Sequence, residues 1–93
     1  MIEAEQSIIA SMIQNPDCVD DVLDSLSADD FLSPMARVAF TSIVELTNSG
    51  TEIDVLTVAE KMDNLKYVTE LVTETHTFGI KVAIEIIKKD SRS

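Results

Sequence analysis

The fold is decided around the stretch Ala28-Asp29-Asp30-Phe31-Leu32-Ser33-Pro34, in which a turn leads into a helix. Ser33 favours the N-cap position, and Pro34 suits the first helical position because its missing N–H would be unpaired there in any case. We expect the ring of Phe31 to enter the core from the turn. The helix is predicted to continue until Gly50, which ends it as the C′ residue.

Helical periodicity extends to both sides of this stretch. Ile8 with Met12, and Ile9 with Ile13, form i,i+4 pairs that predict a helix over residues 3–14. Further helices are predicted over residues 17–26, 34–49, 55–62, 64–74 and 78–90. The sequence therefore predicts an all-α fold, a compact orthogonal bundle of about six short helices around an aliphatic core.

Each predicted helix should bury one apolar face. Asn15 or Asp17 is expected to cap the second helix, and Asp54 the fourth. The residues expected to face inward from the second helix onward are Val19, Val22, Leu23, Leu26, Met35, Val38, Ala39, Phe40, Ile43, Leu46, Leu56, Ala59, Met62, Leu65, Val68, Leu71, Val72, Phe78, Val82, Ile86 and Ile87.

The chain is strongly acidic. Its 17 Asp and Glu residues exceed its 7 Lys and Arg residues, for a net charge of −10, and no basic residue occurs between Met1 and Ala36. Such a surface repels phosphate, so we expect no direct binding of DNA. It favours a partner with a basic patch, although the same charge would also serve solubility alone.

Part of this charge is predicted to form an acidic face on the second helix. Its residues are Asp17, Asp20, Asp21 and Asp24. Their spacing is that of a solvated helix face. A calcium-binding loop would need alternating oxygen ligands, a glycine at the sharp turn and a closing glutamate, so no metal site is predicted.

The sequence carries no catalytic motif. It lacks a phosphate-binding P-loop, and its single cysteine, Cys18, and single histidine, His76, lie far apart in the sequence. We expect Cys18 to pack as a small apolar residue. Without a basic leader or an apolar run long enough for a membrane span, the chain is expected to be soluble and cytoplasmic.

Three blocks of sequence resemble the N-terminal domain of the DnaB family of bacterial and phage replicative DNA helicases. The blocks are Ile2-Glu3-Ala4-Glu5-Gln6-Ser7, then Ala28-Asp29-Asp30-Phe31 with Pro34, Arg37 and Phe40, then Gly50 with Ile53-Asp54 and Thr57-Val58-Ala59-Glu60. The chain departs from the family pattern at Leu32 and Ala36, which replace a tyrosine and a histidine. A family loop with paired glycines is shortened to Asp63-Asn64-Leu65-Lys66, and the similarity is looser after residue 60.

The resemblance implies that residues 1–93 are a single head domain from a longer helicase, ending before a helical hairpin and an ATPase domain. In this family the heads form a collar above the hexameric motor and contact primase and, in some systems, the helicase loader. The head is then not an enzyme and binds no cofactor, because ATP and Mg²⁺ belong to the motor domain. Alone, it is expected to be a monomer or a weak dimer.

The last predicted helix has more apolar residues than one small core needs, so we expect it to pack partly against another chain. The candidate interface residues are Phe78, Ile80, Ile84 and Ile87. Two other functions remain open at this point: a stand-alone, phage-type regulator that mimics the helicase head, and an acidic protein that mimics DNA. The second would need carboxylates spaced along an elongated face.

Overall fold

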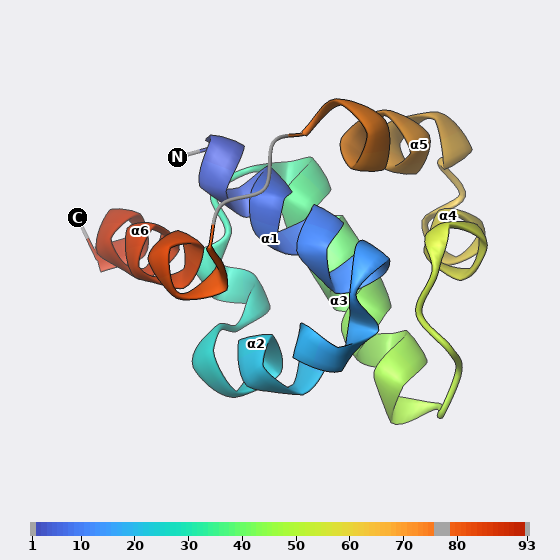
Figure 1. The fold of residues 1–93 in the computed structure, drawn as a ribbon, viewed down its shortest axis with the longest axis horizontal. Helices are drawn as coiled ribbons and strands as arrows, with labels where there is room; N and C mark the ends of the chain where they lie inside the picture. The colour runs from blue at the N-terminus through green and yellow to red at the C-terminus, as the bar shows by residue number, and fades with distance from the viewer. Residues whose placement is uncertain (1, 76–78, 93) are drawn as a thin grey trace.

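The computed structural model describes residues 2–75 and 79–92 as a bundle of six α-helices with two short 3₁₀ helices (Figure 1). The elements are α1 Ile2–Gln14, η1 Pro16–Cys18, α2 Val19–Ser25, η2 Ala28–Asp30, α3 Pro34–Asn48, α4 Val55–Met62, α5 Leu65–Glu74 and α6 Ile80–Arg92. The predicted all-α fold is confirmed, and the described residues contain no strand.

Helix α1 lies in the middle of the bundle, between α6 on one side and α4 and α5 on the other (Figure 1). It therefore buries residues on several of its sides, and Ile8, Ile9 and Met12 are fully enclosed. Phe31 enters the core as predicted and meets Phe40 of α3, with ring centroids 4.7 Å apart. These two rings are the largest side chains in an otherwise aliphatic core.

The predicted boundaries of α3 are confirmed at both ends. The hydroxyl oxygen of Ser33 accepts a hydrogen bond from the Ala36 N–H at 3.4 Å, and Pro34 occupies the first turn. At the other end Gly50 has a φ of 74°, in the left-handed region. This conformation lets the N–H groups of Gly50 and Thr51 donate to two of the last carbonyls of α3, at 3.1 and 2.9 Å.

A tight turn joins α4 to α5. Asp54 caps α4, as predicted, by accepting the Thr57 N–H at 2.8 Å. Asp63 ends the helix with a φ of 56°, and the next residue, Asn64, donates its N–H to the Ala59 carbonyl at 3.1 Å. The Asn64 side chain then accepts the N–H of Tyr67 at 3.1 Å and so begins α5 at once.

The predicted cap of the second helix is wrong. Neither Asn15 nor Asp17 caps α2, because the chain first forms the 3₁₀ turn η1 and α2 follows directly from Cys18 without a side-chain cap.

Several residues predicted to face inward are exposed. They are Met35, Val38, Leu56, Leu65 and Val82. In α4 the buried residues are Val58 and Ala59, so Leu56, two positions earlier, points to the opposite side and is 71% exposed. In α6 the inward stripe passes through Ala83 and Ile87, which turns Val82 outward. Helix α6 begins at Ile80, and Phe78 lies outside the described residues.

Candidate interaction surfaces

Two charged residues of the family-like blocks hold the turn before α3 in place. Glu5 is 1% exposed, and its two carboxylate oxygens accept the backbone N–H groups of Leu32 at 3.1 Å and Ser33 at 3.0 Å. Arg37 donates from Nη2 and Nε to the Phe31 carbonyl at 2.8 and 3.3 Å. These contacts fix the internal geometry of the domain, so Glu5 is not available to a partner.

The buried role of Glu5 was missed from the sequence. The signal is its place in the helical pattern, because Glu5 precedes Ile8, Ile9 and Met12 by three, four and seven residues and therefore shares their face. A carboxylate on such a face must find hydrogen-bond donors inside the protein. The N–H groups at the start of α3 are those donors.

The acidic face predicted on the second helix is solvent-exposed. Its four carboxylates, Asp17, Asp20, Asp21 and Asp24, are all on the surface. Cys18 is buried beneath them, and burial together with the charges of Asp21 and Asp17 raises the pKa of its thiol. Within residues 2–75 and 79–92, no group of acidic, His or Cys side chains is arranged to hold a metal ion.

The candidate interface on α6 needs one correction. Ile87 is fully buried and belongs to the core, so it cannot contact a partner. Ile80 and Ile84 are half-buried and pack against the core from its edge, while Phe78 lies outside the described residues. The interface stays a prediction for Ile80 and Ile84.

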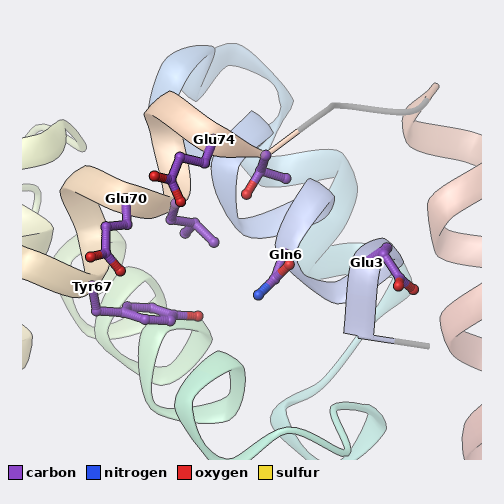
Figure 2. A pocket seen from close by; sticks show the side chains of 7 residues that line it. Glu3, Gln6, Tyr67, Glu70 and Glu74 are labelled. Atoms are coloured by element: carbon purple, nitrogen blue, oxygen red, sulfur yellow. The ribbon is translucent and has the colours of Figure 1, made fainter.

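A concave surface lies between α1 and α5 (Figure 2). This α1–α5 groove has a volume of about 470 Å³ and is lined by Glu3, Gln6, Tyr67, Glu70, Leu71, Glu74 and Thr75. The hydroxyl end of Tyr67 and the amide of Gln6 point toward each other from the two helices, while Glu70 and Glu74 project from α5 (Figure 2). Burial, and then the charge of Glu5, raises the pKa of the Tyr67 phenol.

An apolar strip marks the start of α3. It consists of Leu32, Met35 and Val38, which are 59%, 38% and 48% exposed. Their spacing of three residues places them on one side of the chain as it enters the helix. The residues that follow them in the sequence, Ala36, Ala39 and Phe40, are buried.

Comparison with known protein families shows to which family the chain belongs. The family model described as the DnaB-like helicase N terminal domain matches residues 1–89. The chain belongs to this family. The resemblance carried by the three sequence blocks is therefore confirmed.

Individual members of the family are moderately similar. Over 62 residues, 67% of the chain, it is 34% identical to the replicative DNA helicase DnaB of Mycobacterium leprae and 32% identical to those of Leifsonia xyli and Buchnera aphidicola. The matched regions make up 10%, 14% and 13% of those helicases, so the chain corresponds to a small part of each.

The fold agrees with a solved structure of the same domain. The N-terminal domain of DnaB helicase from Mycobacterium tuberculosis superimposes with a TM-score of 0.89 over 99% of this chain and 73% of that one, at 24% sequence identity. The six-helix architecture is therefore that of the DnaB N-terminal domain. Among the described residues, no helix combines the length and the apolar character needed to cross a membrane.

Proposed function

We propose that this chain acts as the assembly and partner-contact domain of a replicative DNA helicase, contributing to the collar above the motor and contacting primase and, where one is used, the helicase loader. The match of the family over residues 1–89 carries this proposal. In this role the domain does no catalysis. ATP and Mg²⁺ would be bound by the motor domain of the helicase.

The surface of the domain supports a function in protein contact. The polar contacts of Glu5 and Arg37 are used to hold the fold, whereas apolar side chains such as Leu32 and Leu56 remain exposed. A net charge of −10 disfavours DNA as the direct ligand. The bundle measures 33 × 26 × 21 Å. A shape of these proportions has no elongated face of the kind that mimicry of DNA would need.

Calorimetric titration of the chain with the primase encoded by the same genome tests the proposal. We expect saturable binding to primase and no change in the fluorescence anisotropy of a labelled single-stranded DNA. Binding to DNA without binding to primase would contradict the assignment. Sequencing the gene beyond codon 93 adds an independent test, since a following ATPase domain is expected.

The contact between subunits is proposed to use the outer edge of α6. An Ile84→Asp variant should then weaken any dimer seen by size-exclusion chromatography, because a charge would be placed among half-buried apolar side chains. An unchanged elution profile at concentrations where the wild-type chain dimerises would remove α6 from the interface.

A further inference from the structure

We propose that the α1–α5 groove binds a segment of a partner protein that presents an arginine or lysine side chain over Tyr67, between Glu70 and Glu74 of α5 and Gln6 of α1. This inference rests on the proposed function, since it names the surface and the chemistry of one partner contact.

The groove has the size of a binding site. Its volume of about 470 Å³ lies within the range of roughly 300–1,000 Å³ that is common for ligand pockets. It is formed by two helices that hydrogen-bond elsewhere, since the Gln14 side chain donates to the Val72 carbonyl at 2.9 Å. The walls are therefore held at a fixed separation by contacts outside the groove.

One face of α5 supplies most of the lining. Tyr67, Glu70, Leu71 and Glu74 are spaced by three and four residues, so they lie one above the other along the helix. The half-buried ring of Tyr67 and the buried Leu71 make an apolar floor. The exposed carboxylates of Glu70 and Glu74 stand above it.

The charge of the groove is not neutralised within the part of the chain that the structure describes. Neither Glu70 nor Glu74 forms an ion pair there, whereas Lys61 of α4 pairs with Glu45 of α3 at 3.4 Å. Two like charges four residues apart on a helix repel each other. A cation bound between them would remove that repulsion.

The floor of the groove also favours a cation. The face of a tyrosine ring attracts an ammonium or guanidinium group through its quadrupole. Burial raises the pKa of the Tyr67 phenol, and the negative charge of Glu5 adds to this rise, so the ring lies near a third carboxylate. An arginine could lie flat on the ring while its donors reach Glu70 and Glu74.

The alternatives fit less well. A nucleic acid would bring phosphate groups toward the carboxylates of Glu70 and Glu74, which is unfavourable. A purely apolar peptide would leave these carboxylates partly desolvated without a partner. A basic segment satisfies both the charge and the apolar floor.

Binding to a synthetic helical peptide of arginine, alanine and leucine tests the inference by fluorescence anisotropy. Because any cationic peptide is attracted to a protein of charge −10, the comparison needs variants of equal net charge. E70Q/E74Q removes two carboxylates from the groove. E52Q/E60Q is the matched control, since it makes the same two Glu-to-Gln changes at exposed positions outside the groove.

We expect Kd for the peptide to rise about fivefold in E70Q/E74Q, as for the loss of two exposed ion pairs, and by less than about twofold in E52Q/E60Q. Tyr67→Phe should retain the affinity of the wild-type chain, whereas Tyr67→Leu, which loses the ring, should bind more weakly at unchanged charge. Equal weakening by both charge variants, or no binding to the wild-type chain, overturns the inference.

The outcome is separable from that of the proposed function. If the chain binds primase while the two charge variants weaken the peptide equally, the groove inference fails and the proposed function stands. If the groove binds the peptide as expected but the chain does not bind primase, the proposed function fails and the groove remains a site for another basic partner.

Discussion

Glu5 and Ser33 are joined by a hydrogen bond of 3.0 Å, in which the backbone N–H of Ser33 donates to a buried carboxylate 28 residues earlier in the chain. The neighbouring N–H of Leu32 donates to the other oxygen. The two bonds attach the N-terminal helix to the residues that begin α3. They do so with a charged acceptor, which makes stronger hydrogen bonds than a neutral one.

Replacing Glu5 with glutamine should lower the free energy of unfolding by about 2 kcal/mol, because the amide keeps one acceptor and turns a donor toward a backbone N–H. Urea unfolding followed by circular dichroism measures the change. Glu3→Gln is the control, since Glu3 lies on the same helix and is exposed, and it should stay within about 0.5 kcal/mol of the wild-type chain. Equal effects at the two positions would contradict the buried contact.

Substituting alanine for Gly50 should destabilise the domain by about 1 kcal/mol, since a residue with a Cβ is strained at a φ of 74°. No neighbouring atom lies close enough to clash with the added Cβ, so the cost comes from the backbone alone. Gly79→Ala provides the comparison, because Gly79 also has open space around it but no positive φ. Thermal unfolding should separate the two variants, and identical melting temperatures would argue against the left-handed turn.

Truncation of two aliphatic side chains should have very different effects. Ile43→Ala removes a fully buried side chain and should cost about 3 kcal/mol. Leu56→Ala, at 71% exposure, should change the stability by less than about 0.5 kcal/mol. Chemical denaturation of both variants checks the exposure of Leu56, and a large loss at Leu56 would mean that α4 is rotated from its position here.

The thiol of Cys18 should react slowly while the domain is folded. Burial, followed by the charges of Asp21 and Asp17, holds its pKa above the ordinary value of 9.0. Alkylation by iodoacetamide as a function of pH should therefore give a higher apparent pKa in the native chain than in urea. An Asp21→Asn variant should shift the native profile toward lower pH.

The raised pKa of the Cys18 thiol also makes the stability of the fold depend on pH. Above pH 9 the unfolded chain releases the thiol proton while the folded chain still holds it, so the stability contributed by the thiol falls as the pH rises from the unfolded toward the folded pKa. Cys18→Ala should remove this part of the pH dependence. A native thiol that reacts as fast as the unfolded one would show that Cys18 is not enclosed.

The sequence predicted the helices better than their orientations. Caps such as Ser33 and Asp54 act through neighbours three residues away, so local chemistry was sufficient to place them. The outward position of Leu56 depends on which sides of α4 pack against α3 and α5. The apolar pattern within one short helix does not reveal how that helix packs against its neighbours. Ile87 was predicted both to face inward and to contact a partner, and its complete burial confirms only the inward position.

The interaction surfaces were only partly predictable. All four carboxylates of the predicted acidic face are exposed, but Asp17 lies in η1, so only Asp20, Asp21 and Asp24 belong to α2. The α1–α5 groove joins residues more than sixty positions apart, such as Gln6 and Tyr67, and no local pattern connects them. The groove becomes apparent only when the two helices are seen packed against each other.

The turn at Asp63 and Asn64 also bears on how related domains diverge. Asn64 both completes the end of α4 and accepts the N–H of Tyr67, so the length of this turn sets where the floor of the groove lies. Inserting or deleting a residue there would rotate the lining of α5 without altering any lining residue. A change in the length of this turn alone would therefore reshape the groove while the amino acids along α5 stay the same.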